Sequence, residues 1–300
     1  MRATIVIPTH DRPQDLRRTL ASALAALPED GEIVVVDDRS DPPAAEGMAP
    51  DGRVRLLRND GPPGASGARN HGVQAARRET VFFLDDDDEM LPGHPDRILR
   101  QAGTADCGFS HRRSRRGDPL SDSRPRAPTG LLPPGMPWRL RVAALSGGFR
   151  IRREVFLDAG GLDPGLSIDE DTDLCCRLIA AGRACWYAAE PGVIVRAPDG
   201  AGPPRLTDRS NSPEGVDCYR RTCRKNWEAF APLPGGRWFL LRRYLRRAVR
   251  AGEQKEARVL LRDLRPPALR IAGRAYLLAK SAVHAAKAGQ ATNRQERTNG

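Results

Sequence analysis

Apolar runs and amphipathic stretches alternate through the first half of the chain. Three apolar runs predict strands, and a fourth stretch alternates polar and apolar residues, which is typical of a strand nearer a sheet edge. Two further stretches predict helices, one with leucines spaced along a single face and one after a glycine-rich turn. The strands are expected at residues 3–8, 31–38, 53–58 and 80–85, and the helices at 13–27 and 64–78. This order predicts an α/β fold, with a mostly parallel central sheet flanked by helices.

The second half of the chain is less regular. Residues 111–137 are rich in Pro, Arg and Ser and show no periodicity, so we expect a functional lid or a disordered loop there. Residues 185–197 predict a hairpin, residues 198–213 another loop, and residues 214–231 a helix.

Acidic residues follow two of the predicted strands. Asp37 and Asp38 end the second strand, and four consecutive aspartates, Asp85 to Asp88, end the fourth. Ligands of open α/β sheets bind beyond the carboxyl ends of the strands. Alternation along the chain should direct Asp85 and Asp87 to one side and Asp86 to the other. Paired carboxylates suit Mg²⁺ or Mn²⁺, and the strand-end position favours such a site over a solvated acidic turn.

A second acidic group begins a predicted helix. Its apolar stripe contains Asp171, Leu174, Cys175 and Leu178, which are spaced to share one face. Acids at a helix start commonly cap backbone amides and complement the helix dipole. That role suits Asp169 or Glu170, whereas Asp171 lies on the face expected to point toward protein.

Net charge is unevenly distributed along the chain. The total is +11, but residues 237–300 contain 16 Lys and Arg against 4 Asp and Glu, which leaves 33 against 34 in residues 1–236. The near-neutral larger part argues against a nucleic-acid-binding module. The six cysteines form no C-x-x-C pair, so we expect reduced thiols. With no signal peptide or spanning segment recognised, we expect a soluble cytoplasmic protein.

Residues 238–251 form a basic amphipathic pattern. Arginines fill one helical face, and Phe239 is the only large apolar residue among them. The other face contains Trp238, Leu240, Leu241, Tyr244, Leu245, Ala248 and Val249. Two alternatives remain open: the helix contacts an anionic membrane surface, or its apolar face packs on the larger domain while the arginines are solvated. We expect residues 236–288 to form a basic helical extension and residues 289–300 a disordered tail.

Five motifs occur in the order typical of one enzyme family. They are IVIPTHDR, EIVVVDDRSDP, NDGPPGASGARNHGVQAA, VFFLDDDDEM and GGLDPGLSIDEDTDLCCRL. Over about residues 3–197 the sequence resembles family 2 glycosyltransferases. The resemblance implies a Rossmann-like GT-A catalytic domain, expected at residues 1–235, which transfers sugars from nucleoside-diphosphate donors with inversion at the anomeric carbon.

The resemblance also implies roles for individual residues. Nucleotide-sugar contacts are implied for Pro8, Thr9, Arg12, Asp37 or Asp38, Arg69, Asp85 and Asp86, with Asn70 supporting a turn. Asp87, together with Asp85, is the implied ligand set for Mn²⁺ or Mg²⁺. Departures from the family pattern at His10, Asp11 and Arg39 leave the nucleobase open, with a UDP-sugar expected.

The resemblance also implies that Asp171 is the general base, which takes the proton from an acceptor hydroxyl. Neighbouring acids at positions 169, 170 and 173 should raise a carboxylate's pKa, and Asp173 should pair with Arg177 one turn later. A Q-x-x-R-W motif of processive synthases is absent, so we expect transfer of a single sugar.

The acceptor is unidentified, and both a lipid-linked and a small-molecule acceptor are compatible with the sequence. Two other functions remain as alternatives. One is a sugar nucleotidyltransferase, although the expected G-x-G-T-R-like loop is missing from the first motif. The other is a non-catalytic protein that binds anions, on a membrane or a nucleic acid.

Overall fold

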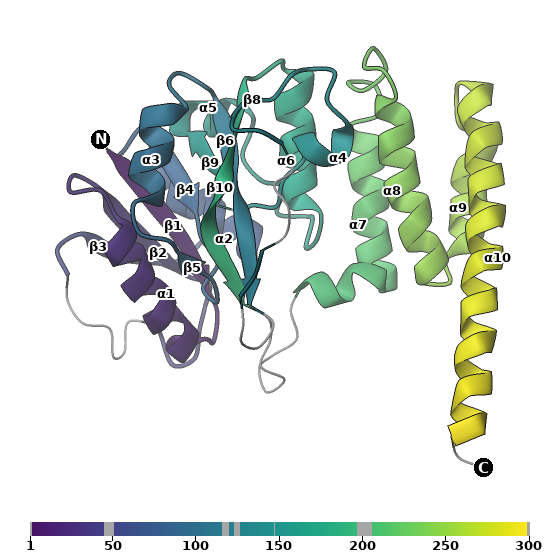
Figure 1. Ribbon diagram of the computed structural model, residues 1–300, viewed down its shortest axis with the longest axis horizontal. Helices are drawn as coiled ribbons and strands as arrows, with labels where there is room; N and C mark the ends of the chain where they lie inside the picture. The colour runs from purple at the N-terminus through teal and green to yellow at the C-terminus, as the bar shows by residue number, and fades with distance from the viewer. Residues whose placement is uncertain are drawn as a thin grey trace. The chain divides into compact units, whose positions relative to one another are not determined.

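The protein is described by a computed structural model (Figure 1). The structure describes residues 2–44, 51–115, 120–122, 127–146, 148–196 and 206–298. The chain divides into two compact units, Met1–Pro203 and Pro204–Gly300. The division falls before the predicted domain limit at residue 235, so residues 206–235 belong to the second unit.

Ten strands of the described residues join one sheet in the first unit. Their order is β3-β2-β1-β4-β9-β6-β10-β5, with β7 paired to β6 and β8 to β10. The parallel half consists of β1 (Ala3–Thr9), β2 (Glu32–Asp37), β3 (Val54–Arg58) and β4 (Thr80–Phe83). The mixed half consists of β5 (Glu89–Met90), β6 (Cys107–Arg115), β7 (Leu120–Asp122), β8 (Gly130–Leu131), β9 (Arg150–Arg152) and β10 (Cys185–Arg196). The four predicted strands and the edge position of β3 are therefore confirmed.

Helices cover both faces of the sheet (Figure 1). They are α1 (Pro13–Ala26), α2 (Ala65–Ala75), α3 (His94–Gln101), α4 (Trp138–Arg141), α5 (Arg153–Asp158) and α6 (Glu170–Ala180). Alternate residues of β1 and β4 pack into two different cores. Val6 and Phe83 lie with side chains of α2, α5 and α6, whereas Ile5 and Phe82 lie with side chains of α1 and α3. Burial on both faces explains why these strands are mostly apolar and do not alternate apolar with exposed polar residues.

Two predictions for the mixed half are wrong. The segment 111–137, expected to be a lid or a disordered loop, contributes strands β6, β7 and β8 within its described residues. The hairpin expected at 185–197 is one strand, β10, with register shifts on either side of Pro191. Gly192 does not form a hairpin turn. Glycine is required at this position because a Cβ atom would lie 2.2 Å from Cε1 of His94 in α3.

The second unit is helical. It contains a short 3₁₀ helix, η1 (Leu206–Asn211), followed by α7 (Pro213–Lys225), α8 (Gly236–Arg250), α9 (Gln254–Arg262) and α10 (Pro267–Thr298). The loop expected at 198–213 lies partly outside the described residues. Residues 289–298, expected to be disordered, continue α10.

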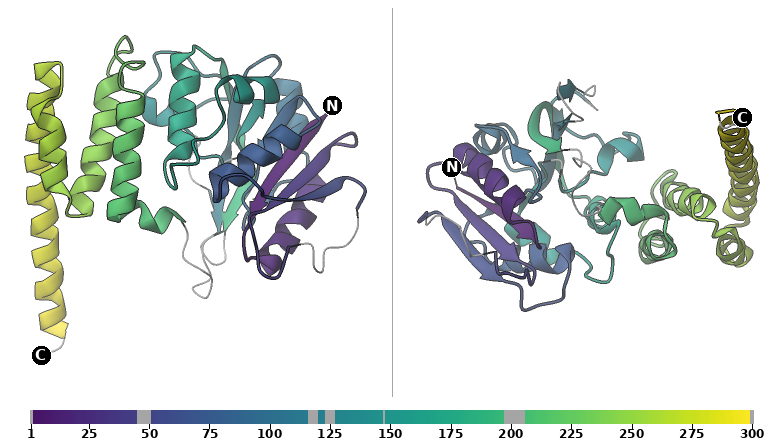
Figure 2. Two further views of the ribbon diagram at one scale, coloured as in Figure 1. Left: turned by 180° about the vertical axis from the view of Figure 1, so that it is seen from behind. Right: turned by 90° about the horizontal axis from the view of Figure 1, so that it is seen from below.

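The apolar face of α8 is covered by protein. Leu240, Leu241, Tyr244 and Leu245 are at most 1% exposed. Phe239, expected on the arginine face, is also buried. Helices α7, α9 and α10 all contact α8, which lies between α7 and α10 (Figure 2). Hence the apolar side of residues 238–251 stabilises the second unit and is not available to a membrane. No helix among the described residues is long and apolar enough to cross a membrane.

Candidate active site

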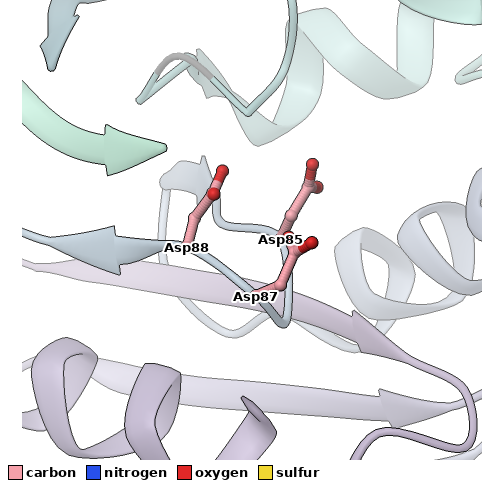
Figure 3. Close-up of side chains that lie close together, drawn as sticks. All are labelled: Asp85, Asp87 and Asp88. Carbon is pink, nitrogen blue, oxygen red and sulfur yellow. The ribbon is translucent and has the colours of Figure 1, made fainter. Parts of the chain in front are cut away.

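The acidic residues after β4 form a compact cluster. One carboxylate oxygen from each of Asp85, Asp87 and Asp88 lies within 4.8 Å of the others. Figure 3 shows the three side chains projecting from the turn that connects β4 with β5. Three carboxylates at this spacing are a suitable donor set for a hard divalent cation such as Mg²⁺ or Mn²⁺. The sequence predicted Asp85 and Asp87 as ligands but did not single out Asp88.

Asp86 is not part of this group of three acids and is held by other residues. Its carboxylate accepts a hydrogen bond from Thr9 Oγ1 at 2.8 Å, and Arg12 Nη1 lies 3.6 Å from it. Burial raises the pKa of Asp86 to about 7, although the bond from Thr9 and the charge of Arg12 oppose the rise. Arg12 also donates to Asp87 at 2.9 Å. Two residues from the end of β1 and the start of α1 therefore hold the middle of the acidic turn.

Backbone contacts fix the shape of the turn. Thr19 of α1 is buried, and its hydroxyl lies 2.8 Å from the carbonyl oxygen of Asp86 and 2.7 Å from that of Asp88. The backbone amide of Arg196, at the end of β10, donates to Asp88 Oδ1 at 3.1 Å. Sequence reasoning missed Thr19 and Arg196, because nothing local indicates that α1 and β10 meet this turn.

Arg69 of α2 connects the acidic turn with the second acidic group. It is 6% exposed and donates to Asp85 Oδ1 at 2.6 Å and to Glu170 Oε1 at 3.1 Å. Burial lowers the pKa of Arg69, but the carboxylates of Asp85 and Glu170 raise it, and the net shift is upward. The bridge places the first residue of α6 beside the carboxyl edge of the sheet. Contact of Arg69 with a nucleotide stays a prediction.

Several carboxylates lie close together at the start of α6. Asp171 is partly buried, and its Oδ1 accepts bonds from the backbone amide of Thr172 at 2.5 Å and from the Thr172 hydroxyl at 3.3 Å. Burial raises the pKa of neighbouring Glu170, the charge of Asp171 raises it further, and Arg69 opposes the rise. The crowding expected from the sequence is therefore present at this helix start.

A buried ion pair anchors α6. Asp173 is 0% exposed and accepts from Arg177 Nη2 at 2.9 Å and Nε at 3.0 Å, as predicted. Arg177 also donates to the carbonyl oxygens of Ala159 and Gly161. Next to this loop, Asn70 exchanges two hydrogen bonds of 2.8 Å with the backbone of Leu162. Asn70 thus supports a turn, the one that leads toward α6.

The acids after β2 have structural partners. Asp37 is 2% exposed and accepts from the amides of Ser40 and Ala44 and from Arg58 Nη1, at 2.8, 3.1 and 2.7 Å. Burial raises the pKa of Asp37, but these donors lower it by more, so the net shift is downward.

Asp38 accepts from Asn59 Nδ2 at 2.6 Å and from the Gly64 amide at 2.7 Å. Pro8, expected to line the nucleotide pocket, is buried within β1. Contacts of Pro8, Asp37 and Asp38 with a base or a sugar nucleotide stay predictions.

Comparison with known proteins identifies the fold. Residues 4–160 match a model of the family described as Glycosyl transferase family 2. Succinoglycan biosynthesis protein ExoO of Rhizobium meliloti (strain 1021) is 40% identical over 104 residues, 34% of this chain and 30% of that protein. The GalNAc(5)-diNAcBac-PP-undecaprenol beta-1,3-glucosyltransferase of Campylobacter jejuni is 30% identical over 113 residues, 36% of each chain. S. aureus TarS 1–349 in complex with UDP-GlcNAc has a TM-score of 0.68 at 15% identity, covering 94% of this chain and 89% of that one.

The sheet and its flanking helices are those of a GT-A fold glycosyltransferase. The chain belongs to glycosyl transferase family 2, whose model matches more than half of its residues. It spans about a third of the length of the two curated relatives named above. The predicted family, fold and enzyme class are therefore confirmed.

Proposed function

We propose that the protein transfers one sugar from a nucleoside-diphosphate sugar, most simply a UDP-sugar, to an acceptor hydroxyl with inversion at the anomeric carbon. The observation that carries this proposal is the bridge through Arg69. It joins the acidic turn, which suits a cation and a diphosphate, to the start of α6, which presents the candidate base. The UDP-GlcNAc complex of TarS, a protein of the same fold, supports a UDP-sugar as the donor.

Asp85, Asp87 and Asp88 would hold Mn²⁺ or Mg²⁺. Such a cation, when bound, supplies positive charge that neutralises the phosphate oxygens of the departing diphosphate. The protein's own residues set up this arrangement. Arg12 and Arg69 hold the carboxylates of Asp87 and Asp85 in place, and Thr19 fixes the turn that carries all three acids.

Asp171 would act as the general base. Its carboxylate takes the proton from the acceptor hydroxyl while that oxygen attacks the anomeric carbon opposite the diphosphate. Two devices hold the base in position: the Arg69–Glu170 pair at the preceding residue and the Asp173–Arg177 pair one turn into α6. Thr172 orients the Asp171 carboxylate through its amide and hydroxyl.

Two relatives suggest the kind of acceptor. One is described as a succinoglycan biosynthesis protein, and the other as a glucosyltransferase acting on an undecaprenol-diphosphate-linked saccharide. We propose a growing saccharide of the cell envelope, carried on a lipid, as the acceptor, and a cytoplasmic location for the enzyme. The nucleotidyltransferase alternative has no support in the described residues, and the match to family 2 argues against it.

The test separates chemistry from binding. Release of UDP from a panel of UDP-sugars, with Mn²⁺ present, would be measured for the parent protein, Asp171→Asn and Asp158→Asn. Asp158 is an exposed acid on α5 and serves as the matched control. We expect Asp171→Asn to lower turnover by about 100-fold or more while UDP binding is kept. Unchanged turnover in Asp171→Asn would overturn the assignment of the base. Failure of the parent protein to release UDP from any UDP-sugar of the panel would overturn the function.

A further inference from the structure

The long helix α10 presents two different faces. On its inward face, Leu277 is 3% exposed, and a Cβ atom added to Gly273 would lie 2.5 Å from Leu261 Cδ2 of α9 and 3.3 Å from Leu241 Cδ2 of α8. Tyr276 packs edge-on against Trp238 with ring centroids 5.7 Å apart. This face already does what most amphipathic helices do, which is to cover a core.

The opposite face of α10 is apolar and exposed. Ile271 and Leu278 are 68% and 64% exposed, which places them among the most exposed large hydrophobic residues of the described chain. Ile271 and Leu278 are two turns apart and lie on one side of the helix. Small exposed residues, Ala275, Ala279 and Ala282, lie around them. Within the second unit α10 packs against the side of α8 that faces away from α7 (Figure 2).

The charge of α10 is predominantly positive. Residues 267–298 contain six Lys and Arg and one acid, Glu296. Arg274 is exposed beside the apolar face, and Arg270 reaches the end of α9, where Nη1 donates to the carbonyl oxygen of Arg262. Arg242 and Arg246 are exposed on neighbouring α8. Two exposed aliphatic residues beside a predominantly basic surface favour a partner that offers both apolar and anionic groups.

We infer that the outward face of α10 binds the surface of an anionic phospholipid bilayer. Ile271 and Leu278 enter the headgroup boundary, while Arg270 and Arg274 beside them contact lipid phosphates. A second copy of this chain fits less well, because pairing two such helices brings like charges together. A nucleic acid fits less well too, because phosphate contacts would leave the aliphatic side chains in water.

The experiment compares two kinds of vesicle. The full chain is sedimented with vesicles of phosphatidylcholine alone and with vesicles that also contain phosphatidylglycerol. We expect binding to the anionic vesicles, weakened by added salt, and much weaker binding to the neutral ones. The double variant Ile271→Ser/Leu278→Ser should lose about tenfold in affinity for the anionic vesicles. Arg270→Gln/Arg274→Gln should lose a similar factor there and little on neutral vesicles.

A matched control keeps the result specific. Leu131→Ser/Leu157→Ser removes two exposed aliphatic side chains from the first unit and should bind as the parent does. Circular dichroism verifies that each variant is folded. The inference is overturned if Ile271→Ser/Leu278→Ser binds anionic vesicles like the parent. It is also overturned if that variant only converts a dimer to a monomer in sedimentation velocity, or if an oligonucleotide is bound in preference to both vesicles.

Discussion

Replacing His94 should make the fold less sensitive to acid. His94 is 0% exposed at the start of α3, its ring lies 5.7 Å from that of Phe82 at 78°, and it fills the space beside Gly192. Burial, and secondarily the charge of Arg97, lower its pKa from 6.5 to about 3. Below about pH 6.5 His94 therefore binds a proton in the unfolded chain but stays neutral in the folded protein. Stability contributed by the neutral ring is present above pH 6.5 and lost as the pH falls toward 3.

The size of this effect follows from the two pKa values. Between about pH 7.5 and about pH 5 the free energy of unfolding should fall by about 2 kcal/mol because of His94 alone. The figure barely changes if the folded pKa is a unit higher, since it is set by protonation of the unfolded chain.

His94→Gln removes the proton site, and urea unfolding at the two pH values measures the slope. His284→Gln, at an exposed histidine of α10, is the control and should keep the parent's slope. An equal loss of stability in His94→Gln and the parent would refute the reasoning.

Two further changes test buried groups. Asp173→Asn should cost about 3 kcal/mol in urea unfolding, because it leaves the Arg177 guanidinium without its buried carboxylate. A cost below about 1 kcal/mol would show that the pair does not anchor α6. Tyr244→Phe should leave stability unchanged or raise it by about 1 kcal/mol, since the buried hydroxyl has no hydrogen-bond partner among the described residues. Burial raises the pKa of Tyr244 to about 12, so the parent should lose more stability than Tyr244→Phe between about pH 10 and pH 12; equal alkaline loss in both proteins would contradict this.

The parallel half of the sheet was predictable because its physical cause is local. Strands β1, β2 and β4 are buried on both faces, and mostly apolar residues suit that environment. The same logic located the acidic turn, since polar residues directly after such strands reach the carboxyl edge. The mixed half was mispredicted because its residues are selected by contacts with residues far away in the sequence. Gly192 resembles a turn residue in the sequence, yet it is needed where His94 of α3 approaches β10.

The candidate site shows the same division. Asp85, Asp87 and Asp171 could be selected from the sequence, because spacing on one strand end or one helix face is a short-range property. The Arg69–Glu170 bridge joins residues 101 positions apart, and the bonds from Thr19 join residues 67 and 69 apart. Only the topology brings those groups together. The burial of Phe239 has a similar origin, because α8 is enclosed by three helices and not by one core.

Calorimetric titration of UDP into the protein, with and without Mn²⁺, tests the central claim most directly. The claim is that Asp85, Asp87 and Asp88 hold a cation that in turn holds the diphosphate. We expect Mn²⁺ to tighten UDP binding by about tenfold or more in the parent and in Asp60→Asn, which alters an acid with a 91% exposed side chain. Asp87→Asn should abolish that gain. Equal UDP affinity with and without Mn²⁺ in the parent, or an undiminished gain in Asp87→Asn, would contradict the account.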